Sequence, residues 1–294
     1  MPEPSAVRRQ LGSELTAVRL AAGLDQRTLA QGIGISQKSV SRFERGERIP
    51  DGLHVVQAWL DACRPRPRGY PAGVQNRIRA LYRAAAGETR SWTELLKGSH
   101  LQDVARERNL AAAAAYNVQT VLLPGLLQVE AYARRALAAA AASSGLPAGD
   151  LEADVAARLA RQAVLLEPGR RFMFLIAERL LRFVPGPSSP NASDWDDVIA
   201  PQLEHLVEVA ELDTVSLAIL PDTAGDVVWH PFILREPADG SPPYVTVEMI
   251  HGEQELRDAP DVVIYRGLWS RLMRRAWSGP DAVARVRAVL AEGR

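Results

Sequence analysis

The chain has 294 residues, with 35 lysines and arginines balanced by 35 aspartates and glutamates, and a single cysteine, Cys63. No stretch approaches the ~20 uninterrupted apolar residues of a membrane-spanning helix, and one cysteine excludes an internal disulfide framework. The polar start lacks the apolar segment of a secretory signal, so we expect a cytoplasmic protein of about two domains, with no membrane partner.

Basic and acidic side chains are unevenly distributed along the chain. Residues 1–110 hold 18 basic and 11 acidic side chains, a net of +7, whereas residues 111–294 hold 17 and 24, a net of −7. A basic amino-terminal part suits contact with nucleic acid, and an acidic remainder suits a domain that stays away from it. Chance segregation of surface charge is the alternative.

Residues 24–46, LDQRTLAQGIGISQKSVSRFERG, predict two short helices joined by a tight turn. Asp25 is of the residue type that caps helix N-termini, and an apolar helical face follows it. We expect this helix to stop at Gly32, with Gly32-Ile33-Gly34 supplying the turn, because glycine tolerates positive φ. Ser36 then caps a second helix, which Gly46 ends.

The second predicted helix places Val40 and Phe43 inward. Its outward side carries polar and basic residues, namely Gln37, Lys38, Ser39, Ser41, Arg42 and Arg45. This pattern is typical of a helix-turn-helix whose second helix enters the DNA major groove. A solvated charged face on an ordinary helical hairpin is the alternative.

Side-chain chemistry assigns roles on that outward face. Outward residues near the start of the helix reach base edges, so the expected readers are Gln37, Lys38, Ser39 and Arg42. Glutamine bonds adenine N6 and N7 together, whereas arginine and lysine suit guanine O6 and N7. Arg45 and Arg48 lie where the chain leaves the groove and are expected to neutralise phosphates. Glu44 is expected to turn away or to pair with Lys38 or Arg48 at helical spacing.

The first sixty-odd residues resemble the helix-turn-helix of the Cro and phage-repressor (xenobiotic-response-element) family. The resemblance implies a first helix at Val7–Ala22 and a fourth at Leu53–Cys63 after the possible cap Asp51. It also implies base readers at the first, second and sixth positions after the cap, which here are Gln37, Lys38 and Arg42, and a backbone-contacting glutamine, which is Gln26. The chain departs from the family in its acidic Asp25 and in a Met1–Ser5 tail without a basic arm.

Proline and glycine mark the end of this module. Arg64–Pro71, RPRPRGYP, cannot be helical and predicts a stiff, basic spacer, which helical stretches at Gln75–Ala86 and from Trp92 to about Arg108 follow. We therefore divide the chain into a helix-turn-helix domain (1–64), a proline-rich linker with connecting helices (65–109) and a C-terminal sensor or partner-binding domain (110–294).

The C-terminal part predicts strands flanked by helices. Helices are expected at Leu126–Ala142, Leu151–Leu166, Trp195–Glu211, Asp258–Trp277 and Asp281–Glu292, with a loop at Pro185–Ser193. Strands are expected at Arg171–Ala177, Val215–Leu220, Phe232–Glu236 and Val245–Ile250. The alanine-rich runs 111–115 and 138–142 are interpreted as helix interior. The expected class is α+β: an all-α N-terminal domain and a mixed α/β domain with a small sheet packed by helices.

Several segments of this part resemble the C-terminal domain of many actinobacterial (Streptomyces-type) regulators. The match rests on YNVQTVLLPGLLQVEAYARR at Tyr116–Arg135, RLARQ at Arg158–Gln162, Val215–Pro221 and Tyr244–Glu255. The resemblance implies no assigned chemistry. Because genes of this type often neighbour a gene for a small protein, some members are called antitoxin-like.

Catalytic motifs are not recognised in the C-terminal part, although groups capable of acid–base chemistry are present: Glu178, His205, His230, Glu248, His251, Glu253 and Glu255. The segment Glu248–Glu253 lacks the two-histidine spacing of a zinc protease, and a solvated strand end and turn is the preferred interpretation. We predict no enzyme, no cofactor and no metal. The aromatic residues of this half could line an effector pocket, form a partner surface or simply fill the core, and the sequence does not distinguish these three interpretations. They are Trp195, Trp229, Phe232, Tyr244, Tyr265, Trp269 and Trp277.

Together these patterns predict a sequence-specific transcriptional regulator associated with the nucleoid. One recognition helix reads few base pairs, so we expect a homodimer on a palindromic operator of double-stranded DNA. A small protein or a small-molecule effector would act on the C-terminal domain. The alternative is an antitoxin-like protein that binds a small partner and uses DNA binding for autoregulation, and an enzyme with a DNA-binding appendage ranks third.

Overall fold

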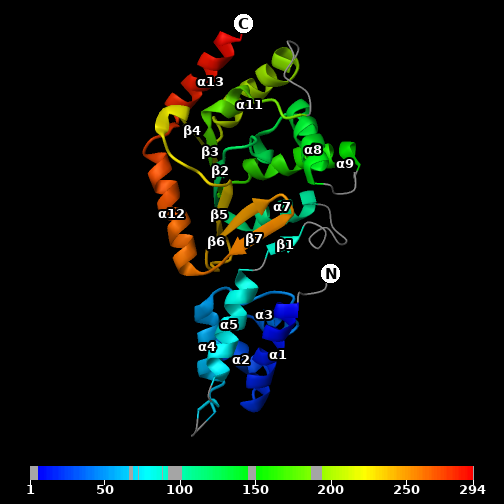
Figure 1. The fold of residues 1–294 in the computed structure, drawn as a ribbon, viewed down its shortest axis with the longest axis vertical. Helices are drawn as coiled ribbons and strands as arrows, with labels where there is room; N and C mark the ends of the chain where they lie inside the picture. The colour runs from blue at the N-terminus through cyan, green and yellow to red at the C-terminus, as the bar shows by residue number, and fades with distance from the viewer. Residues whose placement is uncertain are drawn as a thin grey trace. The chain divides into compact units, whose positions relative to one another are not determined.

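The computed structural model describes residues 6–65, 69–71, 73–87, 89–91, 101–144, 150–186 and 194–293. The features predicted on residues 1–5, 66–68 and 92–100, and most of the Pro185–Ser193 loop, lie outside these ranges. The chain forms two compact units (Figure 1). The first unit joins Met1–Arg90 with Gln254–Asp261, and the second joins Ser91–Glu253 with Val262–Arg294.

The first unit is helical. Its helices are α1 (Ala6–Ala21), α2 (Gln26–Ile33), α3 (Gln37–Glu44), α4 (Leu53–Ala62) and α5 (Val74–Ala86). Apolar residues three and four positions apart give each helix one buried stripe, as Leu11, Leu15 and Val18 do on α1. These stripes meet around Trp59, which is fully buried and donates from its indole nitrogen to the Leu15 carbonyl at 3.2 Å.

Helix α5 is an integral part of this core. The sequence places Gln75–Ala86 in a connecting region, whereas Ile78 and Tyr82 of α5 are fully buried with α1 and α4. Cys63 is buried in the same cluster, and burial raises the pKa of its thiol to about 11. The thiol is therefore protonated at neutral pH, which suits a structural residue.

Residues Gln254–Asp261 also belong to the first unit, although they follow it by more than 160 positions. The side-chain amide of Gln254 donates to the Gly87 carbonyl at 3.0 Å. Arg257 lies 3.3 Å from a carboxylate oxygen of Asp51 and 2.6 Å from Glu255. A segment from the far end of the chain thus completes the helical unit.

The second part of the chain is built around a mixed sheet. Its strands are β1 (Thr89–Ser91), β2 (Ala112–Gln119), β3 (Arg171–Ala177), β4 (Val215–Leu220), β5 (Phe232–Pro237), β6 (Tyr244–Met249), β7 (Gly252–Leu256) and β8 (Trp277–Ser278). The strand order is β1-β7-β6-β5-β2-β3-β4-β8. The central strands β2, β3 and β4 are parallel, while β5, β6 and β8 pair with their neighbours in antiparallel directions.

Strand β2 corrects one prediction. The alanine run 111–115 is not helix interior beyond Ala111, where α7 (Leu101–Ala111) ends, because Ala112–Gln119 is a central strand. Alanine favours helices by intrinsic propensity, but β2 lies between β3 and β5, where tertiary pairing outweighs propensity. The second alanine run, 138–142, is helical as predicted.

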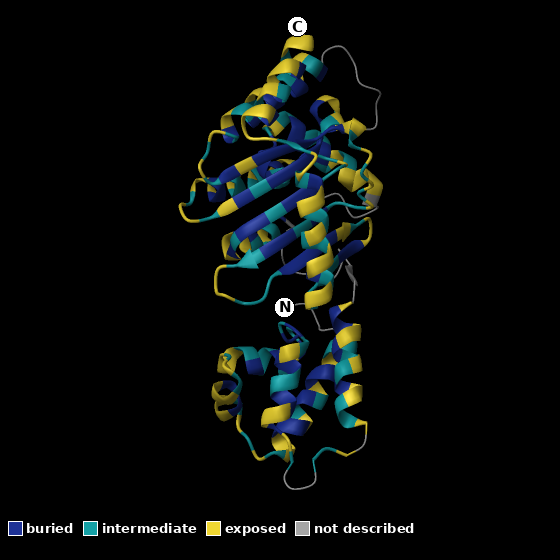
Figure 2. Ribbon diagram, turned by 90° about the vertical axis from the view of Figure 1, so that its left-hand side faces the viewer, coloured by how far each residue is buried: buried dark blue, intermediate teal, exposed yellow. Residues whose placement is uncertain are grey.

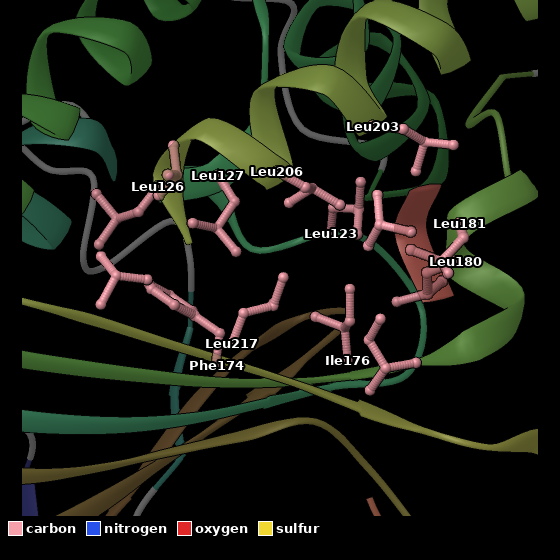
Figure 3. Packing of buried hydrophobic residues seen from close by; sticks show 14 of the residues in the cluster. Leu123, Leu126, Leu127, Phe174, Ile176, Leu180, Leu181, Leu203, Leu206 and Leu217 are labelled. Carbon is pink, nitrogen blue, oxygen red and sulfur yellow. The ribbon is translucent and has the colours of Figure 1, made fainter. Parts of the chain in front are cut away.

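Helices cover one face of this sheet. They are α8 (Glu130–Ser144), α9 (Leu151–Ala160), α11 (Ala200–Val209) and α13 (Pro280–Glu292), with short turns η1 (Gly125–Leu127), η2 (Arg161–Leu166), η3 (Glu178–Arg182), η4 (Trp195–Ile199) and η5 (Asp222–Ala224). Figure 3 shows leucines of η1 and α11 above Phe174, Ile176 and Leu217 of the strands. In Figure 2 the strands carry long buried stretches, whereas the helices expose one side.

Helix α12 (Ala259–Met273) packs on the opposite face through aromatic contacts. Tyr116 meets Trp269 edge to face with ring centres 5.3 Å apart, and Phe232 meets Tyr265 in the same way at 4.9 Å. These aromatic residues are therefore packing residues of the sheet. Trp229 differs from them because 88% of its surface is exposed.

Most predicted elements are present, with shifted ends. The strands at Arg171–Ala177 and Val215–Leu220 have the predicted bounds. The helix expected from Leu126 begins at Glu130, because Pro124 leads into the η1 turn. The helix expected to end at Trp277 stops at Met273, and Trp277 enters β8. The fold class is α+β, as predicted, and among the described helices none is long and apolar enough to cross a membrane.

Candidate nucleic-acid interface

Two side-chain caps and one glycine fix the ends of helices α2 and α3. Asp25 accepts a hydrogen bond from the Thr28 amide at 2.7 Å, which lowers the pKa of its carboxyl, and Ser36 accepts one from the Ser39 amide at 3.1 Å. Gly34 has φ of 72°, the left-handed conformation that reverses the chain between α2 and α3. The prediction that α2 stops at Gly32 is wrong: α2 continues through Ile33.

Helix α3 lies close against α1 because Gly12 has no side chain. A Cβ atom added at Gly12 would lie 2.4 Å from the Glu44 carbonyl oxygen and 2.8 Å from that of Phe43. Both are backbone atoms, so a larger residue would force the helices apart. Gly46, with φ of 70°, turns the chain away at the end of α3 and abuts the Arg8 backbone. The approach of α1 and α3 thus depends on glycines that the sequence analysis did not single out for packing.

A buried ion pair joins the same two helices. Arg19 donates from Nε and Nη2 to the two carboxylate oxygens of Glu44 at 2.5 and 2.9 Å, and the side chains are only 9% and 6% exposed. Hydrogen bonding to Glu44 raises the pKa of Arg19. Glu44 turns away from the outer face of α3, as one alternative predicted, whereas the other alternative, a pair with Lys38 or Arg48, is wrong, because Glu44 pairs with Arg19 across the helix interface.

Gln26, expected to meet the DNA backbone, belongs to this network. Its side-chain nitrogen donates to Glu44 Oε2 at 2.7 Å. Gln26 remains half-buried at the first turn of α2. The bond with Glu44 therefore holds the amide at the amino-terminal end of α2.

The outer face of α3 presents the predicted readers. Gln37 and Lys38 are exposed, and Ser39 is half-buried with its hydroxyl 2.9 Å from that of Ser36. The side chain of Arg42 is 41% exposed, and its Nε lies 3.8 Å from a Glu47 oxygen. Val40 and Phe43 are buried behind them, as predicted. The structure thus gathers Gln37, Lys38 and Arg42 on the accessible side of one helix.

The two expected phosphate contacts, Arg45 and Arg48, are paired with nearby carboxylates. Arg45 lies 2.6 Å from Glu47, and this contact lowers the pKa of the carboxyl group and raises that of the arginine. Arg48 lies 2.5 Å from Asp51, and its guanidinium carbon is 5.9 Å from the centre of the Phe43 ring. A phosphate would have to compete with these carboxylates for the two arginines.

Two known protein families match the chain. Residues 10–65 match a helix-turn-helix domain, which supports DNA binding and a role in transcription regulation. Residues 103–288 match a domain of unknown function, DUF5753. The chain belongs to the DUF5753 family. Neither a curated protein nor a solved structure matches it at a significant level.

The acid–base candidates of the DUF5753 domain are dispersed. Glu178 pairs with Arg285 at 2.7 Å, and His230 Nε2 lies 3.2 Å from the Tyr265 hydroxyl. His205 lies 3.7 Å from Glu208, while Glu248 and His251 are exposed. Within the described ranges no group of three or more histidines, cysteines or carboxylates is placed to hold a metal ion.

Glu253 was expected at a solvated strand end, and that expectation is wrong. Its side chain is almost fully buried and receives a hydrogen bond from Arg108 Nη1 at 2.6 Å. Glu255 belongs to the first unit, where it pairs with Arg257. The sequence analysis missed the pair of Glu253 with Arg108, as it missed that of Glu44 with Arg19, because an ion pair across 25 or more residues leaves no local periodic signal.

Proposed function

We propose that the protein is a sequence-specific DNA-binding transcriptional regulator of the Cro and phage-repressor type, with α3 as its recognition helix. The support is the joint exposure of Gln37, Lys38 and Arg42 on one side of α3, behind which the Arg19–Glu44 pair and Gly12 fix the helix. In this role these side chains read base edges, while Gln26, Arg45 and Arg48 contact the phosphate backbone.

Replacement of a reader tests this assignment. Arg42→Ala should weaken binding to the selected operator by ~1–3 kcal/mol and relax the preference at one base position per half-site. Arg45→Ala should instead weaken all sequences alike and reduce the salt dependence of binding, because a phosphate contact carries no sequence information.

The measurement first selects bound genomic fragments with wild-type protein and then titrates single-base variants of the recovered site. Arg134→Ala, at an exposed position on α8, is the matched control and should leave both affinity and base preference unchanged. Unchanged selectivity in Arg42→Ala would remove this residue from the readers.

We further propose that the protein binds its operator as a homodimer. A single α3 reaches only a few base pairs, so useful specificity needs two half-sites about 34 Å apart. Sedimentation of the full chain should give a dimer at micromolar concentration, and protection of the operator should be two-fold symmetric. A monomer that protects one unrepeated half-site would contradict this proposal.

We assign the DUF5753 domain a non-catalytic role as a sensor or docking domain. Its support is the net charge of −7 over residues 111–294, which discourages contact with the DNA backbone, and the dispersal of the acid–base candidates. A ligand acting through this domain must bind one conformation of the regulator more tightly than another, because equal affinity would shift no equilibrium.

A further inference from the structure

One face of the sheet changes from apolar to polar along its width. Paired residues of neighbouring strands share a face, so Phe174 of β3, Asn117 of β2, Ile233 of β5 and Thr246 of β6 form one row. Phe174 belongs to the apolar core, whereas Asn117 and Thr246 are polar and at least nine-tenths buried. Arg235, 95% buried, lies on the same face and donates to the Thr246 hydroxyl at 3.0 Å.

Two more arginines come from the helical layer. Arg158 of α9 donates from Nη1 to Gln128 Oε1 at 2.8 Å, and Gln162 donates to the Gln128 carbonyl at 2.6 Å. The segments PGLLQ and RLARQ, which the sequence analysis singled out separately, therefore meet here. A Cβ atom at Gly125 would lie 2.8 Å from Arg161 Nη2 and 3.6 Å from Arg158 Nε, so both guanidinium groups cover this glycine.

Arg158 and Arg161 lack a carboxylate partner among the described residues. The Nε atoms of Arg158 and Arg161 are buried without a hydrogen-bond partner, as is Oδ1 of Asn117. Among the described residues no carboxylate lies within 4.0 Å of either arginine, and the side chain of Arg161 makes no hydrogen bond. Buried polar groups in native proteins are normally satisfied by protein, water or a bound ion.

Burial and like charge both act on these arginines. Burial lowers the pKa of both Arg158 and Arg161 to about 10, and the charges of Arg158 and Arg235 act on Arg161 in the same direction. The exposed carboxylate of Glu248 opposes this effect. Arg158 and Arg161 therefore stay charged at pH 7, so positive charge accumulates there. Arg158 and Arg161 are each partly exposed, so the cluster is open to solvent.

We propose that Arg158 and Arg161, above Gly125 and beside Arg235, form a binding site for a small anionic ligand that is held through a phosphate or carboxylate group. Guanidinium groups suit such oxyanions because they donate parallel hydrogen bonds at fixed spacing. The bound oxyanion supplies the counter-charge and the acceptors that the arginines lack. Anion binding at this site does not depend on the proposed function. A role of the site in controlling DNA affinity does rest on the proposal that the protein is a DNA-binding regulator.

Calorimetric titration of the full-length protein tests the site, with inorganic phosphate and citrate as probes at constant ionic strength. The wild type should bind at least one probe, and the choice between them separates a phosphate from a carboxylate ligand. Arg161→Gln should weaken this binding by about tenfold or more. Arg134→Gln, the control on α8, should bind as the wild type does. No binding of either probe, or equal binding by Arg161→Gln, would overturn the proposal in favour of water-filled packing.

A pair of substitutions at Gly125 tests whether the arginines need a negative charge beside them. Gly125→Asp places a carboxylate against both arginines, and Gly125→Asn places an uncharged side chain of the same size there. The aspartate variant should lose the response to the probes and melt at a temperature about 2–4 °C or more above that of the asparagine variant. Equal melting temperatures, with retained anion binding, would show that no counter-charge is needed.

Operator affinity measured with and without the binding probe separates the two proposals. A change in affinity that Arg161→Gln abolishes supports an effector role. Anion binding with unchanged DNA affinity would leave the site standing and refute only its use as an effector site.

Discussion

At the scale of single residues, the helix-turn-helix depends on one charge that the sequence presents as a surface residue. Glu44 lies among outward-facing polar residues of α3, yet it accepts hydrogen bonds from Arg19 and Gln26 in a buried position. Its role follows from the distance between two helices rather than from spacing along one. Such a residue is indistinguishable from a solvated glutamate until α1 and α3 are placed together.

Glu44→Ala should therefore destabilise the first unit strongly. Its loss leaves Arg19 charged, buried and without its carboxylate, which typically costs about 3–5 kcal/mol. Urea unfolding followed by the fluorescence of Trp59 measures the change. Glu47→Ala is the control, because Glu47 pairs with the exposed Arg45 and surface pairs contribute about 0–1 kcal/mol. Equal effects of the two substitutions would show that the buried pair has no special weight.

At the scale of elements, caps and glycine turns could be predicted from the sequence, whereas strand β2 could not. Asp25 and Ser36 cap α2 and α3 as expected, because capping is a local interaction between neighbouring residues. The run Ala112–Ala115 becomes a strand only through pairing with β3 and β5, which are distant in the sequence. The buried polar residues Asn117, Arg235 and Thr246 likewise share one face only in the assembled sheet.

The contact between α1 and α3 gives a prediction at this scale. Gly12→Val should lower both the stability of the first unit and its affinity for DNA, because the new side chain meets the Phe43 and Glu44 carbonyls and displaces the recognition helix. Thermal unfolding and operator titration would measure the two effects. Gly32→Ala provides the contrast. Gly32 lies in α2, and a Cβ atom added there would have no neighbouring atom within 4 Å, so this substitution should stabilise the protein by ~0.4–1 kcal/mol. A neutral Gly12→Val would mean that α1 and α3 tolerate separation.

At the scale of the whole molecule, the division of the chain is not a simple sequence of domains. The sequence predicts boundaries at residues 64 and 109, from prolines and composition. The first compact unit instead extends to Arg90 and takes in Gln254–Asp261, which lies between β7 and α12. The chain therefore passes between the units three times. The composition of residues 254–261 does not reveal this return to the first unit, because polar segments of this kind are common between a strand and a helix.

This returning segment yields the last prediction. Arg257 and Arg48 share the Asp51 carboxylate, and the Arg257 and Asp51 side chains are only 12% and 15% exposed. Arg257→Ala should destabilise the first unit by about 1–3 kcal/mol, because a half-buried carboxylate loses one of its two charged partners. Thermal unfolding of the full chain should show a lower transition for the first unit and an unchanged one for the second.

Arg274→Ala serves as the matched control, since Arg274 is an exposed arginine directly after α12 whose side chain, among the described residues, donates to the Ser270 carbonyl of that helix. A double-mutant cycle with Asp51→Ala separates the ion pair from general packing, because coupling between the two positions appears only if they interact directly. Coupling near zero would contradict the structural role of the pair. Substantial coupling would establish that Arg257, which lies within the DUF5753 match, holds the turn that carries Arg48 and Asp51.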